Sequence, residues 1–202
     1  MRSLSALALT LVVVTPGFAH AQGGPAAGTV EITGATGLTI NNQTVTVPGG
    51  GGDFDVTNAS GAAGLHFYIS DRLSLGVVGG FGRLSAGVEG SKITATGMLG
   101  GPQVRYRLGG ERTALVLVGG AGGNILKLET TGSGVDEFSG EAVDANGWYW
   151  EAGADASFLF RDNLAFNIGA RYSATRSTNQ DGLQFDTAGL SIGVGFSFFI
   201  NR

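Results

Sequence analysis

The stretch SIGVGFSFFI, residues 191–200, stands almost at the end of this 202-residue chain and decides its fold. Small residues alternate there with large apolar ones: Ser191, Gly193, Gly195 and Ser197 against Ile192, Val194, Phe196 and Phe198. A period of two is the signature of a β-strand, because successive side chains point to opposite faces of a sheet. The chain therefore closes on a strand with one broad apolar face and one face of small residues.

The same alternation recurs upstream over unusually long segments. Residues 148–160 place Trp148, Trp150, Phe158 and Phe160 on one face and Glu151 and Asp155 on the other. Residues 164–174 repeat the pattern, with Arg171 on the polar face. Strands of a soluble sandwich are usually about five or six residues long. Longer strands with a small, polar second face indicate a membrane barrel that has lipid outside and a packed lumen inside.

Eight such strands are predicted, at 28–40, 54–69, 73–83, 93–107, 113–128, 147–160, 164–175 and 184–199. Short turns follow every second strand, at 70–72, 108–112 and 161–163, and longer connections fall around 84–92, 129–147 and 176–183. This alternation of connections is typical of outer-membrane barrels. The expected fold is all-β, an eight-stranded antiparallel transmembrane β-barrel with up-and-down meander order. Residues 44–56 are expected to form either a raised hairpin tip or a loose loop.

The N-terminus predicts export. Residues 1–21 hold one early Arg2, an apolar run to Val14 and the small-residue triplet Ala19-His20-Ala21, as in a cleaved signal peptide. The apolar run is too short to span a bilayer comfortably. We therefore expect a signal peptide over 1–21, a flexible lead-in over 22–27 and the barrel over 28–202.

The composition excludes several classes of protein and of binding site. The chain has no Cys, which excludes a disulfide scaffold and a thiolate metal site. Its net charge of −4, one unit more negative without Arg2, argues against a nucleic-acid partner. The run GGAGG at 119–123 lies inside a strand pattern without a following Lys, so it does not predict a phosphate loop. No cofactor and no metal site are expected.

Two aromatic girdles are expected on the outer face. Trp148 and Trp150 stand toward the long loops, whereas Phe158 and Phe160 stand beside a short turn. The ten residues from Trp148 to Phe158 rise about 25 Å at about 3.3 Å per residue and a tilt near 40°, which matches the lipid-facing band of such barrels.

From residue 28 onward the chain resembles the small eight-stranded outer-membrane β-barrel family, which includes the OmpA-like and opacity-like surface proteins of the porin family. The closing strand carries the resemblance, because Ser191, Gly193, Phe196 and Phe198 match the family's polar–x–Gly–x–x–aromatic–x–aromatic ending. The resemblance implies that these residues are the signal read by the barrel-assembly machinery. The chain departs from the pattern by continuing through Phe199 to Arg202.

A cluster of charges is predicted in the lumen. If the turn at 161–163 pairs Phe160 with Leu164, Arg171 lies opposite Gly153, diagonally between Glu151 and Asp155. Arg105, together with Arg107 and Gln103, is expected to point inward from the strand at 93–107. Such charges either form a structural ion network, which we favour, or line a selectivity constriction of a pore.

We expect no catalytic residue. Once residues 1–21 are removed the remaining His is His66, and local spacing pairs it with no Ser. The acidic segment 129–147 lacks the spacing of an EF-hand and is expected to be a solvated loop.

The resulting hypothesis is a bacterial outer-membrane protein with a structural or surface-interaction role, in contact with membrane lipid and open to a ligand or host partner at its extracellular loops. A narrow small-solute porin and a lipid-modifying barrel enzyme are the alternatives.

Overall fold

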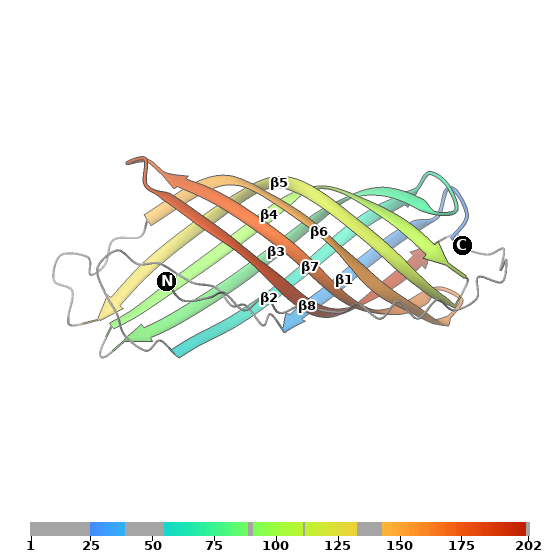
Figure 1. Cartoon of the computed structure of the whole chain (residues 1–202), viewed down its shortest axis with the longest axis horizontal. Coiled ribbons are helices and arrows are strands. Elements are labelled where there is room, and N and C mark those ends of the chain that lie inside the picture. Colours follow the sequence, from blue (N-terminus) through green and yellow to red (C-terminus); the bar gives the residue numbers. More distant parts are fainter. Residues whose placement is uncertain (1–24, 39–54, 89–90, 111, 133–142, 201–202) are drawn as a thin grey trace, which may run out of the picture.

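The protein is a closed barrel of eight β-strands in meander order (Figure 1). The computed structural model of the chain describes residues 25–38, 55–88, 91–110, 112–132 and 143–200. The strands are β1 (Val30–Leu38), β2 (Asp55–Tyr68), β3 (Leu73–Val88), β4 (Ser91–Gly109), β5 (Thr113–Gly132), β6 (Val143–Arg161), β7 (Leu164–Asn179) and β8 (Gln184–Ile200). Every neighbouring pair is antiparallel, and β1 pairs with β8 to close the ring. The predicted fold class and strand number are confirmed.

The two ends of the barrel differ. The tight connections β2–β3, β4–β5 and β6–β7 lie at the end of the barrel where β8 ends (Figure 1). Strands β3 to β7 run two to five residues beyond their predicted ends at the opposite rim, so that only residues 89–90 separate β3 from β4 and 180–183 separate β7 from β8. The long connections predicted at 84–92 and 176–183 are therefore wrong. The predicted strands end where the alternation of apolar side chains stops. Backbone hydrogen bonding between strands continues beyond that point, because it does not require apolar side chains.

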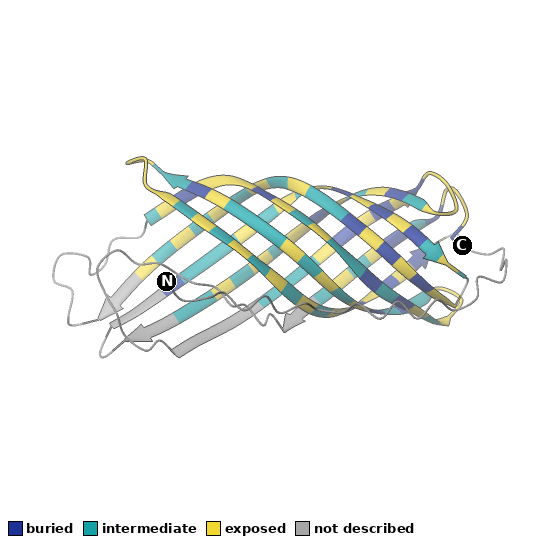
Figure 2. Cartoon of the chain, viewed as in Figure 1, coloured by how far each residue is buried: buried dark blue, intermediate teal, exposed yellow. Residues whose placement is uncertain are grey.

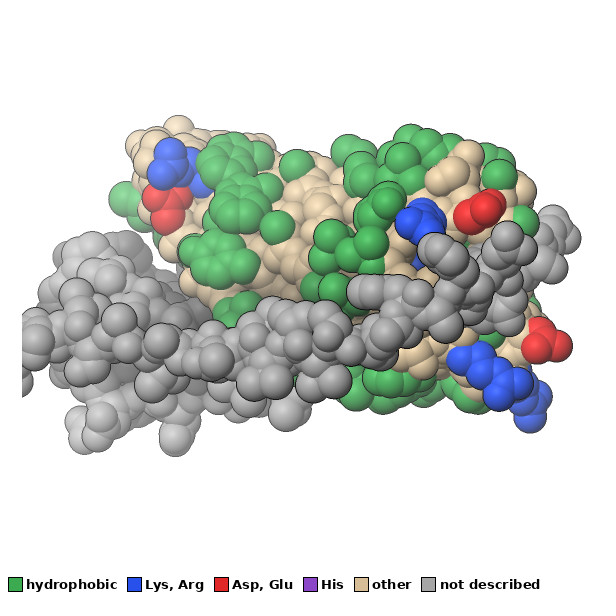
Figure 3. Space-filling view, turned by 45° about the vertical axis from the view of Figure 1, so that its right-hand side comes forward, with side chains coloured by type: hydrophobic (Ala, Val, Ile, Leu, Met, Phe, Trp, Pro, Cys, Tyr) green, Lys and Arg blue, Asp and Glu red, His purple; other side chains and the backbone are tan. Residues whose placement is uncertain are grey.

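The two faces of the sheet follow the predicted alternation. Large apolar side chains are exposed on the outside, among them Phe81 at 60 %, Met98 at 62 % and Ile125 at 62 %. Exposed and buried residues alternate along each strand (Figure 2). Hydrophobic side chains cover much of the described surface in Figure 3, and charged side chains gather toward its ends. Polar groups such as Arg105 and Asp155 are buried inside, whereas large apolar side chains are exposed. This distribution is the opposite of that in a soluble globular protein.

The lead-in to the barrel is partly packed against it. Pro25 is buried, the Thr29 amide donates to the Ala26 carbonyl at 3.0 Å, and the Gly28 amide donates to the Tyr68 carbonyl at 2.8 Å. The predicted signal peptide, residues 22–24 of the lead-in and segment 39–54 lie outside the described residues. In the part of the chain that the structure describes, no helix has the length and hydropathy to cross a membrane.

Candidate functional site in the barrel lumen

Arg105 of β4 is the centre of the charged cluster in the lumen. Its side chain is 3 % exposed, and Nη1 donates to Glu31 Oε1 of β1 at 2.7 Å. Nη2 reaches Asp155 Oδ2 of β6 at 3.5 Å. Strand alternation directs Gln103, Arg105 and Arg107 inward together, as expected from the sequence. One arginine thereby joins strands that are not neighbours in the sheet.

Arg171 of β7 makes the second set of ion pairs. Its Nη2 donates to Asp155 Oδ2 at 2.9 Å, and its Nη1 lies 3.7 Å from Glu151 Oε2. Arg171 is the cross-strand partner of Gly153, which is the predicted register. The register shifts near the turn, where Arg161 and not Phe160 pairs with Leu164, so the bulge leaves the predicted alignment above it unchanged.

Neutral side chains continue this set of contacts. Gln103 Nε2 donates to Glu151 Oε1 at 2.5 Å, and Gln103 Oε1 lies 2.8 Å from His66 Nε2. On the other side the Tyr68 hydroxyl donates to Glu31 Oε2 at 3.0 Å. We call the whole set the luminal network: Glu31, His66, Tyr68, Gln103, Arg105, Glu151, Asp155 and Arg171. It connects five strands across the inside of the barrel.

Glycines on adjacent strands make room for these side chains. A Cβ atom on Gly153 would come within 2.7 Å of Arg171 Cα and 2.8 Å of its Cγ. A Cβ on Gly169 would meet the Asp155 carboxylate, and one on Gly76 would meet the His66 ring. The luminal face of the strands is therefore rich in small residues because long polar side chains from neighbouring strands lie across it.

The cluster is close to charge balance. Two arginines, Arg105 and Arg171, face the carboxylates of Glu31, Glu151 and Asp155. A further cation, Arg107, is 3 % exposed toward the short turns, where its Nη2 donates to the Gly110 carbonyl at 3.4 Å. Buried charges persist only when they are paired and hydrogen-bonded, and these requirements tie the five strands together.

An apolar cluster that shares Tyr68 with the network lies toward the short-turn end. Tyr68, Ala165 and Phe199 are each at most 3 % exposed, and Leu159 packs against them. The rings of Tyr68 and Phe199 lie 6.4 Å apart between centroids. The continuation of the chain past Phe198, which departs from the family ending, thus adds an inward ring to the lumen.

The structure brings together all four predicted luminal residues, Arg105, Glu151, Asp155 and Arg171. The sequence reasoning did not find Glu31 or Tyr68. A signal for Glu31 was present, since Val30 and Ile32 alternate with it in β1, but the alternation of that strand is short. His66, expected in the lumen or at the interface, is in the lumen and 1 % exposed.

The other predicted residues lie on the faces expected for them. Trp148, Trp150, Phe158 and Phe160 are all exposed on the outer face. In β8, Phe196 and Phe198 point outward at 54 % and 42 % exposure, whereas Ser191 and Gly193 lie on the luminal side. The role of β8 as an assembly signal stays a prediction. Within the described ranges, His, Asp and Glu side chains nowhere gather in threes around a point that would hold a metal ion.

A closed eight-stranded barrel with an apolar exterior and a charged, packed interior defines an outer-membrane type of protein. The chain belongs to the family described as the outer membrane protein β-barrel domain, whose sequence model matches residues 5–198. It is an outer-membrane protein of the Gram-negative type. Among curated proteins, none matches the chain significantly.

Solved structures of other outer-membrane proteins resemble this barrel. Neisserial surface protein A is 11 % identical over 87 % of this chain and 98 % of its own, with a TM-score of 0.54. OprG from Pseudomonas aeruginosa is 15 % identical over 90 % of this chain and 100 % of its own, with a TM-score of 0.47. Ail of Yersinia pestis is 19 % identical over 85 % of this chain and 99 % of its own, with a TM-score of 0.42. The likeness to Neisserial surface protein A supports the eight-stranded fold.

Proposed function

We propose that the protein is a non-conducting outer-membrane barrel with a structural or surface-interaction role and no enzymatic activity. The observation that carries this proposal is the luminal network, in which ion pairs join β1, β4, β6 and β7 across the inside of the barrel and hydrogen bonds of His66 and Tyr68 add β2. Eight-stranded barrels have an interior just wide enough to be filled by their own side chains.

An ion that crossed this lumen would have to displace paired charges. Arg105 is 3 % exposed and bound to Glu31 on one side and Asp155 on the other. Removing one partner from a buried ion pair commonly costs about 3–5 kcal/mol, so an opening that separates these groups is rare at equilibrium. Toward the short turns the same path is lined by the closely packed side chains of Tyr68, Ala165 and Phe199, each at most 3 % exposed.

The surface role is assigned to the extracellular rim. The connections 39–54 and 133–142 are the longest in the chain, and they are rich in Gly and polar residues. Surface loops on a rigid scaffold commonly carry binding residues. A ligand or host partner would therefore be bound at these loops.

The proposed route of export and assembly rests on residues 1–21 and on strand β8. Residues 1–21 act as a cleaved signal peptide, and the mature chain begins at Gln22. The β8 residues Ser191, Gly193, Phe196 and Phe198 are read by the barrel-assembly machinery. Mass spectrometry of the protein from outer membranes gives the mature N-terminus directly, and a mass that includes residues 1–21 would contradict cleavage.

The alternative of a lipid-modifying enzyme would rest on His66. Its Nε2 is engaged with Gln103 inside the lumen, and that amide in turn binds Glu151, which favours a structural role for the imidazole. We expect His66→Ala to leave the lipid A mass profile of the host strain unchanged. A lost lipid A species in that variant would favour the enzyme.

Conductance separates the structural role from a small-solute pore. Purified wild-type protein in planar bilayers is expected to give no sustained ion-conducting steps. Arg105→Ala should open the lumen and produce steps, while the exposed Lys127→Ala serves as the matched control and should stay silent. Sustained steps from the wild type would refute the proposal in favour of a porin.

A further inference from the structure

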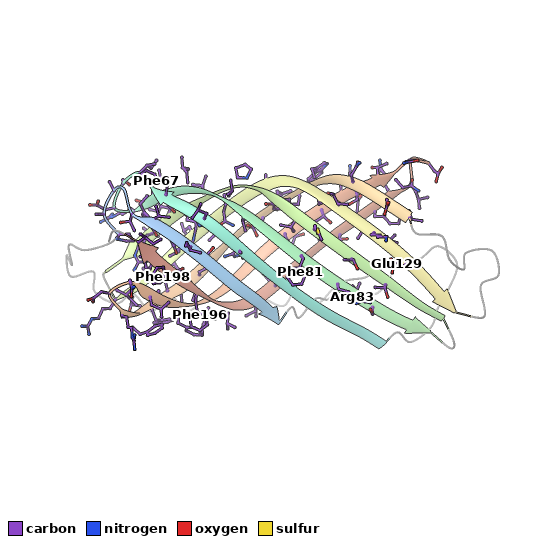
Figure 4. All side chains as sticks on the ribbon, turned by 180° about the vertical axis from the view of Figure 1, so that it is seen from behind. Phe67, Phe81, Arg83, Glu129, Phe196 and Phe198 are labelled. Carbon is purple, nitrogen blue, oxygen red and sulfur yellow. The ribbon has the colours of Figure 1, made fainter. Side chains whose placement is uncertain are left out.

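The two aromatic girdles of the barrel differ in chemistry. Exposed rings at the short-turn end are mostly phenylalanines: Phe67, Phe158, Phe160, Phe196 and Phe198. Phe67, Phe196 and Phe198 gather at this end in Figure 4. Farther from the short turns the exposed rings are Phe81 of β3 and Trp148, Trp150 and Tyr172, and the last three each carry a hydrogen-bond donor. The two leaflets of the membrane thus meet different surfaces.

Charged side chains complete the second girdle. Arg176 Nε and Nη2 donate to Asp186 Oδ1 and Oδ2 at 2.8 and 2.9 Å, and the guanidinium carbon lies 6.0 Å from the centroid of the Trp148 ring. The rings of Trp150 and Tyr172 are 5.6 Å apart between centroids. We call this set the Trp148 patch: Trp148, Trp150, Tyr172, Arg176 and Asp186. Each member holds another in place, so the patch is preformed.

The patch lies at the level of the outer-leaflet headgroups. Trp148, Arg176 and Asp186 form one cross-strand row over β6, β7 and β8. Trp148 stands ten residues from Phe158 along β6, which corresponds to about 25 Å of height across the bilayer. The patch is therefore continuous with the lipid-facing band and adjoins its outer edge.

The geometry of the patch points to a specific kind of headgroup. Both bonds to Asp186 use Nε and Nη2 of Arg176, so the Nη1 hydrogens face away from that carboxylate and suit a phosphate oxygen. Trp148 and Trp150 are two residues apart on one strand and stand about 7 Å apart, next to a row about 10 Å wide across three strands. Such exposed aromatic faces carry negative charge density and attract the C–H groups of a sugar ring.

We propose that the Trp148 patch binds the phosphorylated sugar headgroup of a glycolipid in the outer leaflet. The Arg176–Asp186 pair is neutral as a whole, so general attraction to anionic lipid is weak. Selectivity for a phosphorylated sugar over other anionic headgroups then comes from the aromatic faces together with the contact between Arg176 and the phosphate. Asp186 competes with the phosphate for Arg176, so its removal strengthens binding.

Intrinsic fluorescence tests this directly, because the chain contains only two Trp and both belong to the patch. Folded protein in zwitterionic micelles is titrated with a phosphorylated diglucosamine glycolipid. A saturable change of Trp emission is expected for the wild type. Arg176→Gln should weaken the affinity about tenfold, since a charge-assisted contact of about 1.5 kcal/mol is lost. Asp186→Asn should strengthen it, and Arg83→Gln on β3, outside the patch, should leave it unchanged.

Three further ligands separate the possible sources of the signal. Phosphatidylglycerol in place of the glycolipid should give no saturable change, and an equal response to both would overturn the proposal. Soluble glucosamine phosphate should bind much more weakly, and an equal affinity for it would refute a membrane ligand. Heat-modifiable gel mobility shows whether Arg176→Gln folds. If it does not fold, the affinity of the wild-type protein for the dephosphorylated glycolipid is compared with its affinity for the phosphorylated one. Undiminished affinity for that lipid would overturn the proposal.

Discussion

Replacement of Arg105 by Leu is the sharpest test of the luminal network. The change removes the ion pair to Glu31 at 2.7 Å and that to Asp155 at 3.5 Å. Asp155 keeps Arg171 at 2.9 Å, whereas Glu31 loses its arginine and keeps the Tyr68 hydroxyl. An unpaired buried carboxylate costs about 3–5 kcal/mol, so we expect a loss of that size in the free energy of unfolding.

Two companion variants separate the charge effect from lost packing. Glu31→Gln in the Arg105→Leu background removes the stranded charge and should recover about 2 kcal/mol. Arg171→Leu should cost less, about 1–3 kcal/mol, because the side chain of Arg171 is 25 % exposed and its carboxylate partners keep Gln103 and Arg105. The expected loss of unfolding free energy is thus larger for Arg105→Leu than for Arg171→Leu, because Arg105 is more deeply buried and its removal leaves Glu31 without an arginine.

The measurement is urea unfolding in lipid vesicles, followed by Trp emission and extrapolated linearly to water. The exposed Lys127→Gln is the control, because its partner Glu129 lies in solvent and exposed pairs contribute little. A loss below about 1 kcal/mol for Arg105→Leu, or no recovery with Glu31→Gln, would refute a stabilising network.

Three further comparisons of variants test the faces of the barrel. Phe196→Ala combined with Phe198→Ala should leave export intact and lower the folded fraction in isolated outer membranes, and unchanged folded levels would contradict an assembly signal in β8. Ala154→Arg should destabilise the barrel in liposomes by about 2–4 kcal/mol while Ala154→Leu is nearly neutral, because lipid accepts added volume but not charge; equal, large losses would argue against a lipid-facing position. Gly153→Val should lower the urea midpoint, since its Cβ would stand 2.7 Å from Arg171 Cα, whereas Gly119→Ala, with nothing within 4 Å, should not; equal effects would show that the close approach is unimportant.

Strand number, strand direction and, in the strands with a long alternation, the face of each residue were determined by the sequence alone. A period of two leaves one choice of inside and outside once the apolar face is assigned to lipid, as in β6 and β8. Local turn geometry also predicted that Arg171 would lie opposite Gly153. These features depend on neighbours along the chain or across one hairpin, which a sequence pattern records.

The course of the network across the lumen was decided only by the tertiary structure. Glu31 and Arg105 are 74 residues apart and come from strands that are not adjacent, so their contact appears only when β1 pairs with β8 and the sheet closes. The extent of the strands beyond the membrane likewise depends on backbone pairing and not on hydropathy. Closure and hydrogen bonding of this kind are properties of the whole ring, and no local alternation specifies them.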